Sequence, residues 1–195
     1  MLASIVIAML VLAGCETPGL GGSGAPSENR AARLAQNGDH AEAASVYMGL
    51  AVEAAGFERD RLTLLAVEQY LDAGDVFRAR SAFRNVPRPN SGDLVPLWTT
   101  GRAALHLYNG EADAALGLLE PLSHSPLSRR DRLRVEALRA DTWIQKQDPA
   151  RAVELMTQRE SWVESRRGIE QNRQRLWQGL LVSSPQTLRG AAEIA

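Results

Sequence analysis

Small and large residues recur along the chain with a period close to 36 residues. A glycine is followed after five positions by an alanine, and four positions later by a large apolar residue. A glutamine replaces the glycine in the last of four copies, which are Gly38–Ala43–Tyr47, Gly74–Ala79–Phe83, Gly110–Ala115–Leu119 and Gln147–Ala152–Met156. Four positions before each turn residue stands a large side chain, and three before that a small one, giving Ala31–Leu34, Val67–Tyr70, Ala103–His106 and Ala140–Trp143. This spacing indicates internal repeats.

Each position of the repeat has a mechanical role in a helical hairpin. A glycine can adopt positive φ, so it can end one helix and let the chain reverse. The alanine allows two antiparallel helices to approach closely, and the large residue fills the groove one turn further along the same face. Single hairpins cannot bury their apolar faces alone, so they stack. We predict an all-α, tetratricopeptide-like α-solenoid of about four helical hairpins plus a C-terminal helix, with Ala79 and Ala115 buried.

The order of small, large, glycine, alanine and aromatic residues resembles the tetratricopeptide repeat. Two features differ from that family, whose period is 34 residues and whose first small residue usually follows a leucine. The corresponding residues here are Arg30, Ala66, Arg102 and Arg139. The chain is therefore tetratricopeptide-like.

Capping and loop signals set the boundaries of the helical domain at 28–183. Ser27 can cap a first helix that begins at Glu28. Proline, glycine and serine mark loops at 85–95 and 122–128. A last helix is predicted at 164–182. It either caps the stack or joins it to a further part of the protein. Its apolar residues on or near one face are Ile169, Leu176, Trp177, Leu180 and Leu181. Ser184 and Pro185 are typical of another helix start.

The N-terminal residues predict a lipoprotein signal peptide at 1–14. Residues 2–12 are apolar except for Ser4, and this run is shorter than the roughly 20 residues that cross a bilayer. Leu12-Ala13-Gly14-Cys15 resembles the lipobox of bacterial lipoproteins, in which the cysteine thiol is diacylated, the peptide is cleaved before this cysteine, and the new amine is then acylated. Cys15 is the predicted lipid attachment site, since a lone cysteine cannot form an internal disulfide. Residues 15–27 then form a flexible, glycine-rich tether.

The overall charge balance gives no reason to expect an electrostatic partner by default. The chain holds 22 lysines and arginines against 23 aspartates and glutamates, a formal net charge of -1. A protein with this balance has no field strong enough to recruit nucleic acid. Locally, residues 128–175 carry twelve cations against eight acids. Most of these are expected on solvated helix faces, and an anionic ligand is the alternative.

The sequence offers little catalytic chemistry. Its three histidines, His40, His106 and His124, lie in no metal-binding or nucleophile motif. His106 occupies the large core position of its repeat, where a packing role is expected. The glycines at 19–24 precede the first predicted helix, but no strand comes before them, so they do not form a phosphate-binding loop. We predict no enzyme activity, no catalytic residue, no metal or other cofactor, and no small-molecule substrate.

If the solenoid binds a partner, the first helix of each hairpin should line the concave face that contacts it. Counting along those helices from the large repeat residue gives the candidate partner-binding residues. They are Arg61, Glu68, Asp72, Thr100, Tyr108, Arg134, Asp141 and Gln145. The alternative is that they are ordinary solvated polar residues. The tryptophans Trp98, Trp143, Trp162 and Trp177 are expected mainly in the hairpin core.

Two stretches carry a resemblance to a known family. They run from Leu64-Leu65-Ala66-Val67-Glu68 through Gly74 to Phe83-Arg84-Asn85-Val86-Pro87, and then over Asn172, Trp177 and Leu180. Together they resemble the N-terminal domain of penicillin-binding protein activator lipoproteins of the LpoA type, over roughly residues 58–195. That family continues into a second domain with a periplasmic-binding-protein fold. By this resemblance, residues 184–195 begin a connection to a missing second domain, and the natural protein is expected to be longer.

The resemblance implies a function as well as a fold. Members sit in the outer membrane, on its periplasmic face, and stimulate a bifunctional peptidoglycan synthase, a class A penicillin-binding protein. The chain is thus expected to be a non-catalytic lipoprotein of peptidoglycan biosynthesis, bound to the membrane through its lipid anchor. One alternative is a general tetratricopeptide-like lipoprotein adaptor in outer-membrane assembly or in a peptidoglycan hydrolase complex. A lytic enzyme is a further alternative.

Overall fold

The chain folds into paired helices. A computed structural model describes residues 27–90, 92–186 and 188–189, and these ranges contain helices α1 to α9 and no strand. The helices are α1 (Glu28–Asn37), α2 (His40–Glu53), α3 (Gly56–Asp72), α4 (Val76–Phe83), α5 (Leu94–Tyr108), α6 (Ala112–Ser123), α7 (Arg129–Gln145), α8 (Pro149–Glu160) and α9 (Arg166–Leu181). The predicted signal peptide and Cys15 lie outside the described residues, as does the tether before Ser27.

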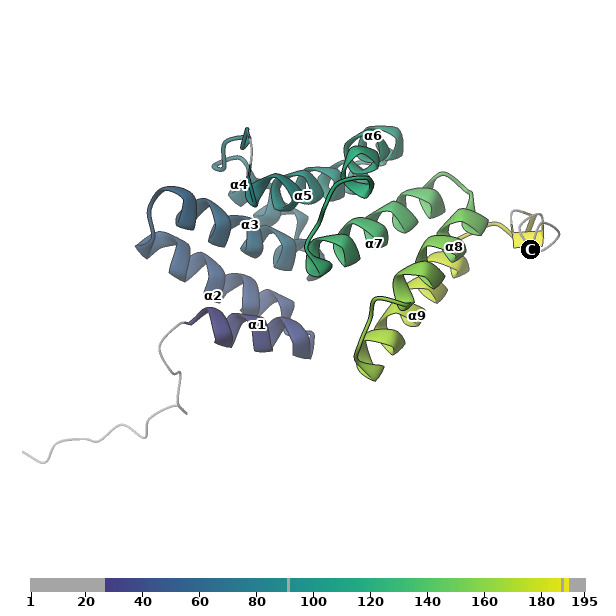
Figure 1. Cartoon of the computed structure of the whole chain (residues 1–195), viewed down its shortest axis with the longest axis horizontal. Coiled ribbons are helices and arrows are strands. Elements are labelled where there is room, and N and C mark those ends of the chain that lie inside the picture. Colours follow the sequence, from purple (N-terminus) through teal and green to yellow (C-terminus); the bar gives the residue numbers. More distant parts are fainter. Residues whose placement is uncertain (1–26, 91, 187, 190–195) are drawn as a thin grey trace, which may run out of the picture.

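Successive helices form four hairpins that stack along an arc (Figure 1). Within the stack α2 packs on α3, α3 on α5, α5 on α7, and α9 packs on α8. α1 and α9 lie at the two ends of the arc and face each other across its open side (Figure 1). The Arg167 guanidinium of α9 donates to the Asn37 carbonyl of α1 at 3.1 Å. The predicted all-α solenoid of four hairpins with a C-terminal helix is confirmed.

The four turn residues of the repeat share one backbone conformation. Gly38, Gly74 and Gly110 have φ of 91°, 76° and 79°, and Gln147 has φ of 60°. In each turn the amide that follows donates to the carbonyl of the large repeat residue, as Asp75 does to Tyr70 at 2.8 Å. This bond satisfies a carbonyl that the helix end leaves unpaired. The left-handed turn is therefore kept even where the glycine is absent.

The repeat positions form the core. The alanines of the second helices, Ala43, Ala79, Ala115 and Ala152, are all 0% exposed. The large residues that follow them, Tyr47, Phe83, Leu119 and Met156, are also buried, as are the small residues Ala31, Val67, Ala103 and Ala140. Full burial of a large apolar side chain contributes about 1.5–3 kcal/mol, so these positions stabilise each hairpin on its neighbour. The predicted burial of Ala79 and Ala115 is confirmed.

The C-terminal helix differs in part from its prediction. Ser165 caps α9, since its hydroxyl accepts from the Gly168 amide at 3.0 Å. The apolar residues predicted on or near one face are split between two. Leu176 packs against the core of the fourth hairpin, whereas Trp177 and Leu181 are 65% and 79% exposed. Trp177 is thus not a core residue, because α9 has only the fourth hairpin to pack on and no helix covers its outer side in the described part of the chain.

The chain turns helical again after α9. Residues 185, 186, 188 and 189 are helical, and the Leu188 amide donates to the Ser184 carbonyl at 3.0 Å. This confirms the predicted helix start at Pro185. None of the helices in the described ranges is long and apolar enough to cross a bilayer.

Candidate partner-binding surface

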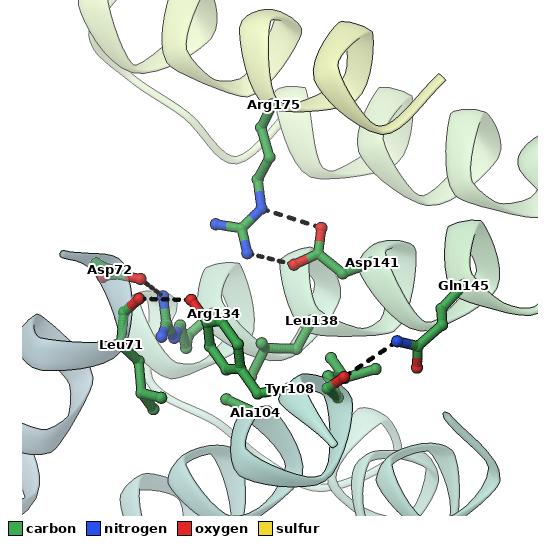
Figure 2. Close-up of a pocket in the computed structure, with 10 residues that line it drawn as sticks. Leu71, Asp72, Ala104, Tyr108, Arg134, Leu138, Asp141, Gln145 and Arg175 are labelled. Carbon is green, nitrogen blue, oxygen red and sulfur yellow. Dashed lines mark hydrogen bonds and ion pairs between the residues drawn. The ribbon is translucent and has the colours of Figure 1, made fainter. Parts of the chain in front are cut away.

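The first helices of three hairpins and the C-terminal helix enclose a pocket of about 210 Å³ (Figure 2). α3, α5, α7 and α9 supply its walls. Its lining consists of Leu71, Asp72, Ala104, Leu107, Tyr108, Arg134, Leu138, Asp141, Gln145 and Arg175. Five of the eight predicted partner-binding residues are among them: Asp72, Tyr108, Arg134, Asp141 and Gln145. The repeat geometry therefore brings these side chains together.

The repeat register explains this convergence. Asp72, Tyr108 and Gln145 each stand two positions after the large residue of their repeat, at the end of a first helix. Equivalent positions of stacked helices lie side by side, so these three polar side chains form one row. The row holds a carboxylate, a phenol and an amide, which are groups suited to hydrogen bonding with a partner.

An ion pair crosses the pocket between α3 and α7. Arg134 Nη1 lies 2.7 Å from Asp72 Oδ1, and their side chains are only 13% and 23% exposed. Burial alone would lower the pKa of Arg134, but the carboxylates of Asp72 and Glu68 outweigh it and hold this pKa above its usual value. Arg134 is therefore permanently charged, and Asp72 is its main counter-ion.

A second ion pair joins the pocket to α9. The Arg175 guanidinium donates from two nitrogens to the two carboxylate oxygens of Asp141, with Nε 3.2 Å from Oδ1 (Figure 2). Burial is the largest single influence and would lower the pKa of Arg175, but the charge and hydrogen bond of Asp141, with a contribution from the charge of Asp72, together raise this pKa. Such bidentate pairs fix both side chains in orientation. α9 is thus held against α7 by directed bonds as well as by packing.

Two neutral residues of the row bind backbone carbonyls of the preceding hairpin. The Tyr108 hydroxyl donates to the Leu71 carbonyl at 2.8 Å, and the Gln145 amide donates to the Leu107 carbonyl at 3.0 Å (Figure 2). Burial is the first cause of the raised pKa of Tyr108, and Asp72 adds to it. Tyr108 as a whole residue remains 52% exposed. It offers a partner an aromatic surface on a fixed support.

Three predicted residues lie elsewhere. Glu68 lines an adjoining groove, where Arg130 Nη2 lies 2.7 Å from its carboxylate. Arg61 lines neither cavity, because it pairs with Glu28 of α1 at 2.6 Å and with Glu58 at 2.8 Å. Arg61 therefore links the first two hairpins.

The placement of Thr100 on the concave face is wrong. Thr100 is 4% exposed, and its hydroxyl donates to the Pro96 carbonyl of the preceding turn at 2.9 Å. It stands six positions before the large repeat residue, and the equivalent residues Leu64 and Ala137 are buried as well. That position faces the neighbouring helices in all three hairpins.

The fold is shared with a protein of known structure. No protein-family model and no curated protein sequence matches the chain. Among solved structures, the chain is similar to the amino-terminal domain of E. coli LpoA, with a TM-score of 0.60. Its fold is that of the LpoA amino-terminal domain. Sequence identity is 16%, and the match covers 74% of this chain and 64% of the LpoA chain. The likeness therefore establishes the helical architecture.

Within this LpoA-like fold, His40 and His106 contact polar side chains, and His124 lies at the surface. His40 Nδ1 lies 2.9 Å from the Gln69 amide oxygen, and His124 is exposed at the end of α6. His106 is partly buried and contacts Glu111, whose pKa its hydrogen bond lowers. In the part of the chain that the structure describes, no three His, Cys, Asp or Glu residues are grouped to hold a metal ion.

Two arginines that line the adjoining groove, Arg159 and Arg175, were not identified from the sequence. Arg175 lies on the C-terminal helix, outside the repeats, so counting within repeats could not find it. Arg159 lies on a second helix of a hairpin, and second helices were not expected to face the partner. The signal that could have indicated them is the cation excess over residues 128–175, which includes both.

Proposed function

We propose that the chain is a non-catalytic outer-membrane lipoprotein that activates or positions a class A penicillin-binding protein from the periplasmic side. The observation that carries this proposal is the LpoA amino-terminal fold. The lipobox-like segment ending in Cys15 supports the location, since acylation there would tether the helical domain to a membrane. Peptidoglycan synthesis is then the process served, and the lipid anchor is the membrane contact.

The candidate partner-binding surface fits a scaffold role. Its polar groups are held by ion pairs and by bonds to backbone carbonyls, which leaves their positions fixed before a partner arrives. Such preorganisation reduces the ordering cost of association. We include Glu68, Asp72, Tyr108, Arg134, Asp141 and Gln145 in the proposed contact surface, and Arg61 and Thr100 are left out for the structural reasons given above.

Crosslinking in cells tests the partner. A photoreactive amino acid at Gln145, which is exposed in the pocket, is compared with the same group at Gln158, which is exposed on α8 outside it. Recovery of a class A penicillin-binding protein from position 145 and not from 158 is expected. Recovery of an outer-membrane assembly complex or a hydrolase complex, without any penicillin-binding protein, would support the general adaptor instead.

Two measurements with purified protein test the activity. Addition of the protein to a class A penicillin-binding protein is expected to raise its rate of peptidoglycan synthesis. Incubation of the protein alone with peptidoglycan is expected to release no muropeptide. Release of muropeptides would contradict the non-catalytic assignment and favour a lytic enzyme.

A further inference from the structure

A larger groove lies beside the pocket, between the beginning and the end of the arc. Its volume is about 840 Å³, and its walls come from α1, α2 and α3 on one side and from α7, α8, α9 and the α8–α9 loop on the other. Five arginines line it: Arg129, Arg130, Arg134, Arg159 and Arg175. Three carboxylates line it as well, on Glu68, Asp72 and Glu164. Positive charge therefore exceeds negative charge in the groove.

Four of the five arginines have carboxylate partners. Arg130 pairs with Glu68 and Arg134 with Asp72, each at 2.7 Å. Arg129 pairs with Glu164, and Arg175 with Asp141 in the neighbouring pocket. Arg159 differs, because no carboxylate of the described residues forms an ion pair with it. Among the residues that the structure describes, Arg159 is thus the groove arginine that has no ion-pair partner.

Arg159 is held rigidly by neutral groups. Its Nε donates to the Leu133 carbonyl at 2.8 Å, and its Nη1 donates to the side-chain oxygen of Asn172. Asn172 is 3% exposed, and its own amide nitrogen donates to the Met156 carbonyl at 3.0 Å, which fixes the amide orientation. Within the described ranges Nη2 of Arg159 has no hydrogen-bond partner. One donor is therefore oriented and unused.

The surroundings of Arg159 favour an incoming anion. Burial, followed by the positive charges of Arg175 and Arg134, lowers the pKa of Arg159 to about 10. The group is still protonated at neutral pH, so its charge is present but poorly compensated. A partly buried charge without a counter-ion is unfavourable, and a bound carboxylate would supply one.

The wall of the groove that carries Arg159 also suits a polypeptide. Gln171, Gln174 and Gln178 lie with Arg175 on one face of α9, and all four line the groove. Side-chain amides both donate and accept hydrogen bonds, which matches the alternating groups of an extended backbone. The one tryptophan among the residues that line the groove is Trp162, and the Arg132 guanidinium lies over one face of its ring, 5.7 Å from the centroid, so that face is not free to stack on a sugar.

We propose that this groove binds an extended acidic segment of a partner protein, with one carboxylate on Arg159. The assignment concerns the chemistry of the ligand and goes beyond the proposed function, since it holds whichever class of partner carries the segment. The contact between Arg167 and the Asn37 carbonyl joins the helices on the two sides of the groove. The bound segment would therefore lie within a bounded channel.

The test is a binding titration in which fluorescence anisotropy at low ionic strength measures how much labelled probe binds to the purified chain. The probe is a fluorescein-labelled peptide of alternating glutamate and serine, and its matched control carries glutamine in place of glutamate. We expect the glutamate peptide to bind and the glutamine peptide to bind at least about tenfold more weakly, because a charge-assisted bond is lost.

Two variants test the site. R159Q should weaken binding of the glutamate peptide at least about tenfold. R33Q removes the same charge from an exposed position on α1 that lines neither cavity, so its affinity should match the wild type. Q174E is a second groove variant, needed in case R159Q fails to fold. It adds a carboxylate at an exposed groove residue, so it should weaken binding of the glutamate peptide by repulsion without disturbing the fold.

Several results would overturn the proposal. They are absence of binding by the wild type, equal loss in R33Q and R159Q, and unchanged affinity in Q174E. Binding of vesicles containing anionic phospholipid, weakened by the same two groove variants, would assign the groove to a membrane surface instead. The outcome is independent of the crosslinking at Gln145, because that experiment identifies a partner through the other pocket.

Discussion

The guanidinium of Arg134 on α7 lies 2.7 Å from the carboxylate of Asp72 on α3, so an ion pair joins two hairpins that are not consecutive. Arg130 and Glu68 form a second pair of this kind. In a straight solenoid each repeat contacts only its neighbours. Here the curvature brings the second and fourth hairpins into contact, and the concave surface contributes to the stability of the fold.

We expect D72N to destabilise the protein by about 1–3 kcal/mol, because it leaves the largely buried Arg134 without its main counter-ion. Urea unfolding followed by circular dichroism measures the free energy of unfolding. D113N is the matched control, since Asp113 is 88% exposed in its pair with Lys146 and such pairs contribute little. A D72N protein as stable as D113N would show that the buried pair has no net effect.

A115L tests the packing between paired helices. Ala115 is 0% exposed, and overpacking a filled core costs about 1–3 kcal/mol. The melting temperature should fall by several degrees. A114L places the same side chain at an exposed position on α6 and should change stability by less than about 0.5 kcal/mol. A melting temperature of A115L at or above the wild-type value would contradict the assigned register.

Gln147 occupies the left-handed turn that glycine occupies in the other hairpins, with φ of 60°. Q147G should therefore raise the free energy of unfolding by about 0.5–1 kcal/mol, because glycine adopts this conformation without steric cost. G74A should lower it by a similar amount, since φ at Gly74 is 76° although its surroundings leave space for a side chain. Thermal unfolding of both variants checks that Q147G is more stable than the wild type and that G74A is less stable. A G74A variant more stable than the wild type would contradict the argument.

Acid should weaken the contact between the first two hairpins. A hydrogen bond from Arg61 is the largest cause that lowers the pKa of Glu28 below 4.5. The stabilisation from this carboxylate is present above its usual pKa and is lost as pH falls through its lowered pKa. E28Q cannot titrate, so its urea midpoint should fall less than that of the wild type between about pH 6 and about pH 3. E53Q, at an exposed carboxylate on α2, should follow the wild type; identical pH profiles for all three proteins would refute the assignment.

Lipidation of Cys15 is expected to determine membrane attachment. In C15A the protein should move from the membrane pellet to the soluble periplasmic fraction, because the acyl chains provide the affinity for the bilayer. S23A, in the predicted tether, should stay in the pellet. Fractionation of cells with antibody detection is the measurement. A C15A protein that remains in the pellet after normal removal of its signal peptide would rule out the lipid anchor.

The sequence predicted the helices and their core residues better than the curvature of the arc that the stacked hairpins form. The repeat register placed Ala79 and Phe83 in the core and aligned Asp72, Tyr108 and Gln145, because these are properties of one hairpin and its neighbour. Thr100 was misplaced because counting from the large repeat residue assigned it to the concave face, whereas its position in the repeat is buried and its hydroxyl bonds a carbonyl of its own helix.

The groove around Arg159 could not be predicted in the same way. Its two hydrogen-bond partners, Leu133 and Asn172, lie 26 and 13 residues away, outside the spacing of the repeat. The angles between successive hairpins determine whether α1 and α9 approach each other. Those angles depend on side-chain shapes across each interface, which a pattern of apolar positions does not contain.

The contact between Arg167 and the Asn37 carbonyl spans 130 residues of sequence and joins the last helix to the first. Small rotations at each hairpin interface add up along the arc and reach their full amplitude at this point. The distance between α1 and α9 is therefore set by the sum of the angles at all the hairpin interfaces between them. The bond ties the two ends of the helical body together, so a change of angle at one interface would have to be compensated at another or would break this bond.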